Sequence, residues 1–270
     1  MYKMKGISLH SIVPVRAEAR EGSEQETQML FGELCEIIDS QPSDPNLPPK
    51  WYQVRLESDG QEGWIDAKML TPMSEQEYNT YSQALKEAAM VAFPMTYAVS
   101  ENNGQTIPLT AGVRLTNYKD GRFEILGAGI RIDPAMVITQ AIELNEQNLF
   151  QTVRFFLNTP YLWGGKNALG IDCSGFTQVV MSLFGKKLLR NASQQVTQGI
   201  AVESWQEIQP GHLVFFDHED GKISHVGIAL DKERVVHCSG RVKVEKLDEK
   251  GIFSTEQGVY THHLVAIRRV

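Results

Sequence analysis

The chain has 270 residues, a length that suggests roughly two domains. Its hydrophobic content of 42% and charged content of 22% are those of a globular protein, which excludes a disordered chain. The formal net charge of −7 argues against a nucleic-acid partner and against adsorption to an anionic polymer.

Three cysteines, Cys35, Cys173 and Cys238, are too few for a disulfide framework. No apolar run is long enough to cross a membrane, so we expect no membrane insertion. The first residues lack the apolar core of a signal peptide. We therefore expect either a cytoplasmic protein or the processed form of a periplasmic one.

Residues 1–72 are predicted to form a first domain of short strands separated by turns. The predicted strands contain alternating apolar residues and cover residues 11–16, 28–38, 51–56 and 63–66. Many short strands without helices favour a small β-barrel. The order of Val-Arg, Phe-Gly-Glu, Trp-Tyr-Gln-Val and Gly-Trp-Ile resembles a bacterial SH3 domain, and any other small barrel is the alternative. Cys35 falls in a strand here and is expected to be buried and inert.

A helical linker and a second small domain are predicted next. Ser74 with Glu77 three residues later forms a capping-box pattern, which predicts a helix from about residue 75 to 90 within a linker of residues 73–90. Residues 91–135 again contain short strands, with hairpin signals at Asn103-Gly104 and Asp120-Gly121. We interpret them as a second SH3-like barrel, although its motif is faint.

A glycine-rich loop, residues 161–176, stands between two predicted helices. The stretch before it, residues 135–157, is largely helical in pattern, and the apolar spacing after it predicts a helix from Phe176 onward. Cys173 is therefore expected at a helix N-terminus, where free N–H groups favour a thiolate and lower its pKa. A catalytic nucleophile is one interpretation, and a small core residue behind a tight turn is the other.

Two histidines downstream can serve such a nucleophile. His225 lies near the start of a predicted strand over residues 223–230, and His237 lies near the end of the next, with a turn over residues 231–234. In an antiparallel hairpin with that turn, the two side chains lie nearly opposite each other on one face. One could act as the base and the other could orient it. Further short strands continue the meander, so an α+β domain is expected, with the nucleophile's helix packed against the sheet.

These motifs together resemble the NlpC/P60 cysteine peptidases of bacterial cell-wall peptides. The resemblance lies in Asp-Cys173-Ser-Gly-Phe, Ser-His225-Val-Gly-Ile and a histidine 12 residues later, and it covers roughly residues 146–270. It implies a papain-like catalytic domain over residues 136–270. The closer resemblance is to the γ-D-glutamyl-L-diamino acid endopeptidases, or dipeptidyl-peptidases VI, which carry two SH3-like domains in front.

The resemblance implies a reaction and a set of site residues. The reaction is hydrolysis of the γ-D-glutamyl–diamino acid bond of a murein peptide with a free N-terminal L-Ala, releasing L-Ala-γ-D-Glu without metal or cofactor. Cys173 is the nucleophile, His225 the base and His237 its orienting partner. The remaining residues are oxyanion support from Tyr161, substrate contacts from Trp163, Asp172, Ser174 and Ser193, and the amine-binding candidates Glu24 and Trp64.

Three alternatives remain open beside this hypothesis. The same scaffold could serve an amidase, a transglutaminase-like enzyme or a lipid acyltransferase, although no amphipathic segment supports a lipid substrate. It could also be a non-catalytic module that binds cell-wall peptides. A zinc site from Cys173, His225, His237 and Cys238 is disfavoured, because there is no Cys-x-x-Cys pair and adjacent strand residues point to opposite faces.

Overall fold

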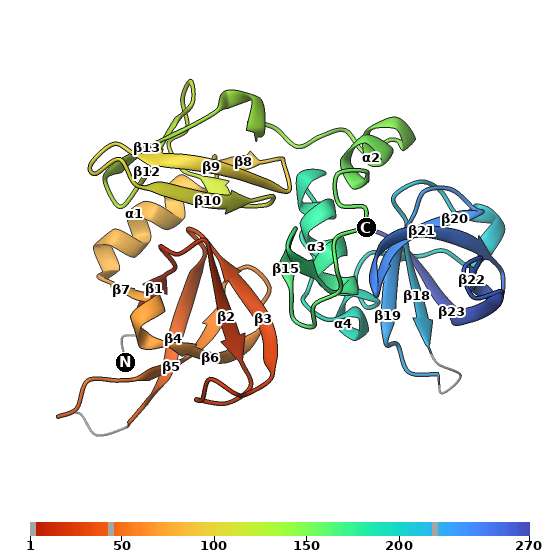
Figure 1. Ribbon diagram of the computed structural model, residues 1–270, viewed down its shortest axis with the longest axis horizontal. Helices are drawn as coiled ribbons and strands as arrows, with labels where there is room; N and C mark the ends of the chain where they lie inside the picture. Colours follow the sequence, from red (N-terminus) through yellow and green to blue (C-terminus); the bar gives the residue numbers. More distant parts are fainter. Residues whose placement is uncertain (1–3, 43–45, 218–220) are drawn as a thin grey trace. The chain divides into compact units, whose positions relative to one another are not determined.

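The computed structural model describes residues 4–42, 46–217 and 221–270. The chain divides into two compact units, Met1–Gln140 and Ala141–Val270, which are described separately here (Figure 1). Among the described residues, no helix is both long and apolar enough to cross a membrane.

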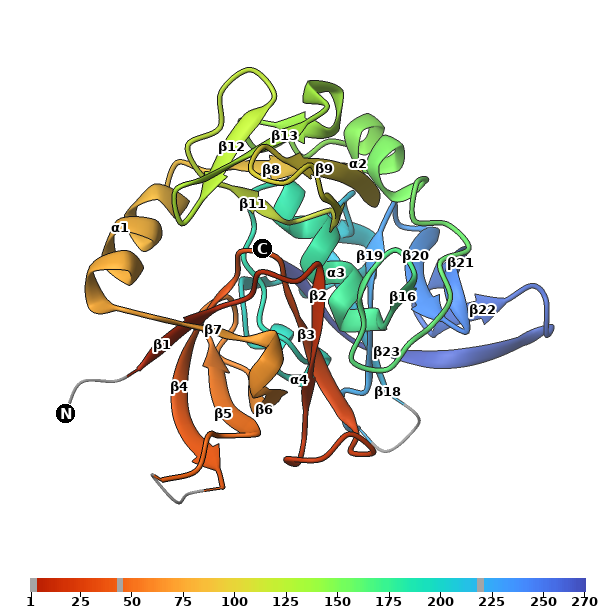
Figure 2. The same ribbon diagram turned by 60° about the vertical axis from the view of Figure 1, so that its left-hand side comes forward.

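The first part of unit one is a curved antiparallel sheet (Figure 2). Its strand order is β3-β2-β6-β5-β4-β1-β7, and alternating side chains such as Val13, Cys35, Val54 and Ile65 form its core. Cys35 has no exposed surface, as predicted. The strands are β1 Lys5–Ile7, β2 Ile12–Arg16, β3 Gln25–Leu30, β4 Leu34–Gln41, β5 Trp51–Leu56, β6 Glu62–Asp66 and β7 Thr71–Met73, with the 3-10 helix η1 Ala67–Met69 before β7.

Helix α1, Glu75–Leu85, begins at the predicted capping box. The Ser74 N–H donates to the Glu77 carboxylate at 2.8 Å, and the Glu77 N–H donates to the Ser74 hydroxyl at 3.3 Å. The helix ends before the expected residue 90, because residues from Ala89 onward pair in a new strand.

The rest of unit one contains two short sheets. A four-stranded sheet has the order β10-β9-β13-β12, and a three-stranded sheet has the order β11-β8-β14. The prediction of a second SH3-like barrel stays a prediction for this region. The strands are β8 Ala89–Val91, β9 Met95–Ser100, β10 Thr106–Thr110, β11 Arg114–Leu115, β12 Arg122–Ile125, β13 Ala128–Ile132 and β14 Val137–Ile138, with the 3-10 helix η2 Pro134–Met136 before β14.

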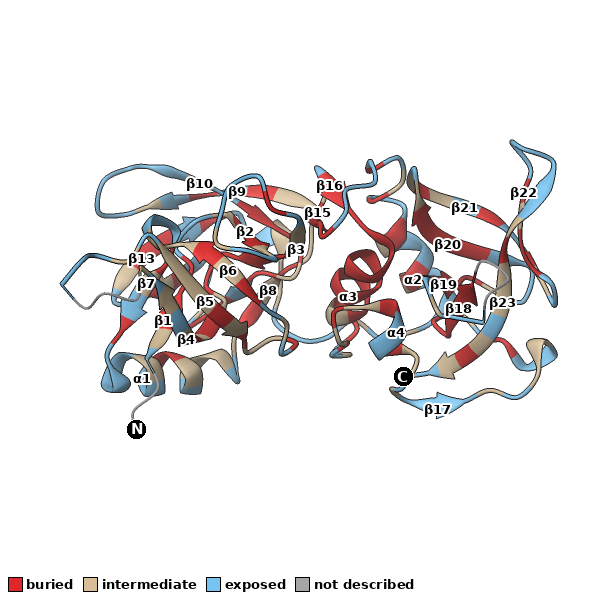
Figure 3. Cartoon of the chain, turned by 90° about the horizontal axis from the view of Figure 1, so that it is seen from below, coloured by how far each residue is buried: buried red, intermediate tan, exposed pale blue. Residues whose placement is uncertain are grey.

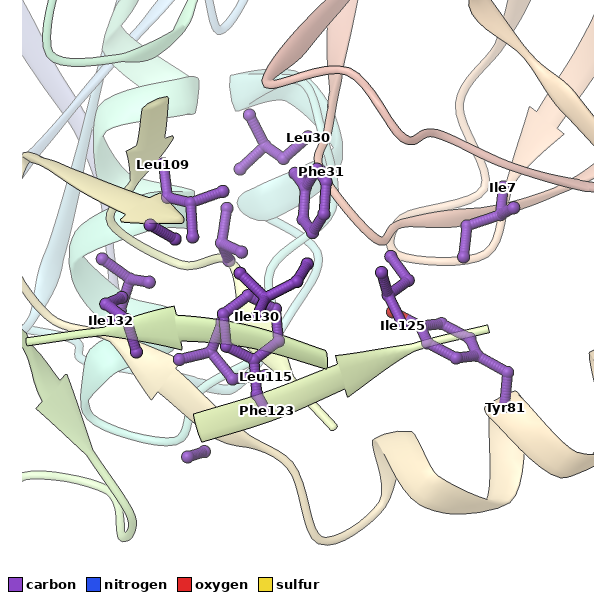
Figure 4. Close-up of a cluster of buried hydrophobic side chains, with 14 of the residues drawn as sticks. Ile7, Leu30, Phe31, Tyr81, Leu109, Leu115, Phe123, Ile125, Ile130 and Ile132 are labelled. Carbon is purple, nitrogen blue, oxygen red and sulfur yellow. The ribbon is translucent and has the colours of Figure 1, made fainter. Parts of the chain in front are cut away.

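Both parts of unit one share a hydrophobic core, shown in Figure 4. Phe31 meets Phe123 edge to face, with ring centroids 6.5 Å apart. The buried Tyr81 of α1 donates its hydroxyl to the Gly32 carbonyl at 3.1 Å. The linker helix is thus part of the packing that joins the first sheet to the two short ones.

The helix predicted over residues 135–157 is wrong in its first half. Val137 and Ile138 are β-branched and pair with β8 instead, and the α-helix of this stretch is α2, Glu146–Val153. The Asn145 side chain accepts the Asn148 N–H at 2.9 Å and so caps a separate, shorter helix.

Unit two is built around a sheet that closes on itself. Strands β18 to β23 pair in sequence, and β23 pairs with both β22 and β18. The meander was predicted, but its closure was not. The strands are β17 Ile200–Ala201, β18 Leu213–Asp217, β19 His225–Ala229, β20 Arg234–Ser239, β21 Arg241–Asp248, β22 Gly251–Ser254 and β23 Val259–Arg269.

Helix α3, Cys173–Leu183, packs against β19 and β20. It is buried along nearly its whole length, as Figure 3 shows, and the buried residues include the polar Ser174, Thr177 and Gln178. The short helix α4, Ala192–Gln195, contacts α3, and the 3-10 helix η3, Trp205–Glu207, precedes β18. The small hairpin of β15, Lys166–Asn167, and β16, Gly170–Ile171, forms the glycine-rich loop that leads into α3.

Candidate active site

The glycine-rich loop places Cys173 at the first residue of α3, as predicted. Asp172 is the N-cap, and its carboxylate accepts the N–H groups of Gly175 at 2.7 Å and Gly164 at 2.9 Å. A Cβ at residue 175 would clash with the Gly165 carbonyl oxygen, so only glycine lets the loop lie this close to the helix. The nucleophile candidate is therefore held by a rigid turn.

A buried arginine completes this turn. Arg190 donates to both carboxylate oxygens of Asp172, at 2.5 and 3.1 Å, and to the Ser174 hydroxyl at 2.9 Å. Its exposed fraction is 1%, so the ion pair is fully enclosed. Asp172 and Ser174 were predicted as substrate contacts, and both are engaged by Arg190. No role was predicted for Arg190 from the sequence.

The Cys173 thiol does not have the lowered pKa that was predicted. Burial and the neighbouring Asp172 charge raise its pKa to about 11, although the N–H groups of Val226 and Ser174 and the Arg190 charge act in the opposite direction. Loss of solvation therefore outweighs the helix N-terminus. At neutral pH the thiol keeps its proton, and it needs a base to become a nucleophile.

The two predicted histidines meet beside this thiol. His225 directly precedes Val226, whose N–H acts on the Cys173 sulfur. His225 Nε2 and His237 Nδ1 are 2.8 Å apart, and both rings are buried. The prediction that the two side chains share a face is therefore confirmed.

The register of the histidine hairpin differs from the predicted one. His237 lies opposite Gly227 rather than opposite His225. A Cβ at residue 227 would come within 3.0 Å of the His237 Cβ and within 2.6 Å of the Val235 side chain. The glycine of the Ser-His-Val-Gly-Ile motif therefore makes room for the diagonal contact between the two rings.

A carboxylate that the sequence prediction missed lies behind His237. His237 Nε2 and Glu245 Oε2 are 2.9 Å apart, and Lys243 Nζ is 3.2 Å from the same oxygen. Strand alternation could have found it, because His237 pairs with Lys243, so residues 243 and 245 share its face. Burial opposes ionisation of Glu245, yet its hydrogen bonds, the one to His237 first among them, lower its pKa to about 2.

A third histidine, for which no role was predicted from the sequence, lies beside this pair. His262 of β23 is buried, and its ring lies over that of His225, with centroids 4.3 Å apart and planes 31° apart. The register of β22 with β23 shifts next to Ile252, which faces His262. Because of this irregularity, simple alternation along the sequence cannot assign the side that His262 faces.

Tyr161, Trp163 and Ser193 were predicted to support the oxyanion or contact the substrate, and they differ in their surroundings. Burial and the charges of Cys173 and Asp172 raise the pKa of Tyr161, which places its hydroxyl in the electrostatic field of the site. Trp163 is 58% exposed in the glycine-rich loop, and Ser193 is exposed on α4. Their substrate contacts stay predictions.

Cys238 is turned away from the histidine pair. Its thiol donates to the Ile171 carbonyl at 3.1 Å, so it ties β20 to the glycine-rich loop. It lies on the opposite face of β20 from its neighbour His237, because adjacent strand residues alternate. Burial raises the pKa of this thiol.

The amine-binding candidates lie at one end of the first sheet in unit one. Glu24 is exposed directly before β3, and Trp64 is half-buried on β6. Arg16 of β2, the strand between them, pairs with Gln25 on one side and Trp64 on the other. The structure thus brings these two predicted residues into one neighbourhood, and their role stays a prediction.

Two known domain families match this chain. The NlpC/P60 family matches residues 158–268, and the bacterial dipeptidyl-peptidase SH3 domain matches residues 15–70. The first range contains the thiol, both histidines and Glu245. The second contains Glu24 and Trp64.

Individual proteins extend the likeness. A γ-D-glutamyl-L-lysine dipeptidyl-peptidase of Bacillus subtilis is 28% identical over 252 residues, covering 90% of this chain and 80% of that protein. One of the same name from Bacillus cereus is 35% identical over 92 residues, covering 33% of this chain and 27% of that protein. A crystal structure of an NlpC/P60 family protein from Bacillus cereus has a TM-score of 0.81 and 19% identity, covering 98% of this chain and 99% of that one.

Proposed function

We propose that this cysteine peptidase, with its NlpC/P60 domain behind a bacterial dipeptidyl-peptidase SH3 domain, hydrolyses the γ-D-glutamyl–diamino acid bond of murein peptides. Its products are L-Ala-γ-D-Glu and a peptide that begins with the diamino acid. The observation that carries this proposal is the 2.8 Å contact between His225 and His237 next to the buried Cys173 thiol. The dipeptidyl-peptidases that this chain resembles supply the substrate class.

In the proposed reaction, the thiol and His225 act together. His225 accepts the Cys173 proton while the sulfur attacks the γ-carbonyl carbon of D-glutamate, forming a tetrahedral oxyanion. The C–N bond then breaks, and His225 returns the proton to the leaving amine of the diamino acid. Water, deprotonated by His225, hydrolyses the resulting thioester and restores the thiol. A base is needed because the thiol's pKa of about 11 leaves little thiolate at neutral pH.

Two donors support the developing oxyanion in this mechanism. The N–H of Cys173 lies in the first turn of α3, where backbone N–H groups have no partner within the helix. The Tyr161 hydroxyl keeps its proton, since its pKa is raised, and it can donate without competing ionisation. Such preorganised donors contribute roughly 2.7–4 kcal/mol each to transition-state stabilisation in related acyl transfers.

Specificity for a free N-terminal amine is assigned to Glu24, with Trp64 beside it. An enzyme that removes a dipeptide must recognise the ammonium two residues before the scissile bond. A carboxylate suits this task, because a charge-assisted hydrogen bond contributes roughly 1.5–3 kcal/mol. Glu24 is exposed and Trp64 lies at the same end of the sheet, so both are available to a ligand.

The test is hydrolysis of L-Ala-γ-D-Glu-meso-diaminopimelate and its lysine analogue, each with a free or an acetylated L-Ala amine. Mass spectrometry should detect L-Ala-γ-D-Glu from the free-amine peptides, and Cys173→Ala should produce none. Acetylation should lower kcat/KM by roughly 10- to 100-fold, the equivalent of one charge-assisted hydrogen bond. Equal turnover of both forms would leave a general endopeptidase in place of a dipeptidyl-peptidase.

A pair of variants separates amine recognition from general charge effects. Glu24→Gln should reduce turnover of the free-amine peptide and leave the acetylated peptide unchanged. Glu21→Gln, another exposed carboxylate of the same loop, is the matched control and should change neither. If both variants behave alike, Glu24 does not bind the amine. Absence of cleavage with every peptide, together with measurable binding, would indicate a binding module.

A further inference from the structure

Three buried side chains of the catalytic domain form a hydrogen-bonded series that ends next to the thiol. Glu245 Oε2 lies 2.9 Å from His237 Nε2, and His237 Nδ1 lies 2.8 Å from His225 Nε2. The side chains come from β21, β20 and β19, three adjacent strands of the closed sheet. Each ring nitrogen in these two contacts can be either a donor or an acceptor, so the position of every proton depends on the first member of the series.

Glu245 fixes the first of these protons. Its pKa of about 2 means that it is an anion, which only accepts hydrogen bonds. His237 must therefore donate from Nε2. Burial, which is the largest influence, lowers the pKa of His237, and nearby Lys243 adds to this effect, so the ring carries a single proton at neutral pH. Its Nδ1 is then bare and can only accept.

The second contact passes this constraint to His225. Because His237 Nδ1 accepts, His225 must donate from Nε2. A neutral imidazole with a proton on Nε2 has a lone pair on Nδ1. A base needs this state in order to take a proton from the Cys173 thiol. His225 is adjacent in sequence to Val226, whose N–H acts on the Cys173 sulfur.

We propose that Glu245 is a positioning residue that sets the tautomers of both histidines and so keeps Nδ1 of His225 unprotonated, the state that can accept the thiol proton. The inference rests on the proposed roles of Cys173 and His225, and it adds Glu245 as a fourth residue to the set of Cys173, His225 and His237. Without the carboxylate, His237 could carry its proton on Nδ1 and donate to His225 Nε2. His225 would then carry its own proton on Nδ1, the wrong state for a base.

The surroundings of Glu245 agree with a fixed, anionic role. Its side chain is 4% exposed, and burying a carboxylate costs several kcal/mol unless its partners compensate. Lys243 on the same strand supplies a positive charge at 3.2 Å. On the far side of His237, the ring of His262 from β23 lies 5.7 Å away, centroid to centroid. The wrong tautomer is costly elsewhere too, since replacing the orienting carboxylate of a serine protease triad lowers kcat by about 10⁴-fold.

The first test uses the native protein and nitrogen NMR. In protein labelled with 15N-histidine, the ring shifts at neutral pH should identify Nε2 as protonated and Nδ1 as bare in both His225 and His237, assigned with His225→Gln and His237→Gln. A proton on Nδ1 of either ring would overturn the proposal. This result does not depend on any variant of Glu245 or on any peptide.

The second test removes the carboxylate and uses Glu249→Gln, an exposed position in the turn after β21, as the matched control. Glu245→Met should lower kcat by about 10- to 10⁴-fold with KM unchanged, and should shift the His225 proton to Nδ1. Glu245→Gln, which keeps an acceptor and the shape, should lie between Glu245→Met and the wild type. The control should match the wild type, and circular dichroism should report the fold of each variant.

A readout without substrate separates this inference from the proposed function. Alkylation of Cys173 by iodoacetamide at neutral pH should slow in Glu245→Met and stay unchanged in Glu249→Gln. If the peptides are not cleaved but alkylation slows, the substrate assignment fails and the tautomer assignment stands. If alkylation, kcat and the His225 proton are all unchanged in folded Glu245→Met, Glu245 has no positioning role. If Glu245→Met does not fold, Glu245→Gln and the native NMR shifts decide.

Discussion

Two buried cysteines in different parts of the molecule differ in what surrounds them. Cys35 lies on β4 of unit one among Val13, Val54 and Ile65, and burial raises its pKa to about 12. Cys173 begins α3 in unit two, and burial raises its pKa to about 11. Burial therefore makes both thiols poor acids. What sets Cys173 apart is the buried histidine pair carried by the neighbouring strands, with His225 next to Val226, and in the proposed mechanism reactivity comes from this partner rather than from the thiol's own pKa.

The largest difference between the two cysteines should appear in activity when each one is replaced by alanine. Cys173→Ala should abolish peptide hydrolysis, by up to roughly 10⁶-fold, as for nucleophiles of hydrolytic triads. Cys35→Ala should leave kcat unchanged. It should lower the free energy of unfolding by about 1 kcal/mol, because the side chain removed is small and buried. Steady-state kinetics and urea unfolding measure both. Turnover remaining in purified Cys173→Ala would remove the nucleophile assignment.

Removing the base should make Cys173 resemble Cys35. His225→Ala should approach the Cys173→Ala defect, because the thiol then has no proton acceptor. His237→Ala should be milder, since the orienting member of a triad contributes less than the base. Its kcat should exceed that of His225→Ala by roughly 10- to 100-fold. Comparing kcat of the two variants tests this order. A more severe loss in His237→Ala would reverse the two roles.

Alkylation sharpens the same comparison without a substrate. Burial raises the pKa of both thiols, so proton transfer to His225 should give Cys173 a higher labelling rate than Cys35. Iodoacetamide at neutral pH, followed by peptide mass mapping, measures it. His225→Ala should remove most of the difference between the two labelling rates. Equal labelling of both cysteines in the wild type would contradict an activated thiol.

The smallest expected effect concerns stability at low pH. Unit two should become less stable as Glu245 is protonated. The folded pKa of about 2 lies below the ordinary value of 4.5, so the stabilisation is complete above pH 4.5 and is lost as the pH falls toward 2. The difference corresponds to at most roughly 3 kcal/mol. Glu245→Gln should reduce the pH dependence of the urea midpoint of unit two across that range, whereas Glu249→Gln should not. An unchanged slope would mean that Glu245 is not ionised in the folded state.

Local patterns predicted much of this site. The apolar spacing after residue 176 placed Cys173 at a helix start, and the even separation of His225 and His237 placed them on one face, because both patterns follow from backbone periodicity alone. The thiol's pKa was predicted with the wrong sign, since burial comes from packing between α3 and β19 that no local pattern contains. Glu245 was within reach of strand alternation. His262 was not, because the register shift beside it is set by how β22 meets β23.

The closure of the unit-two sheet also bears on how the site assembles. Strand β23 covers the open edges of both β18 and β22, so those edges remain bare until residues 259–269 dock. Joining residue 213 to residue 268 closes a long loop, which is an entropically costly and slow step. A variant that weakens the pairing of β23 should therefore expose the unpaired backbone groups of β18 and β22. It should aggregate during refolding even where the thiol and both histidines are intact.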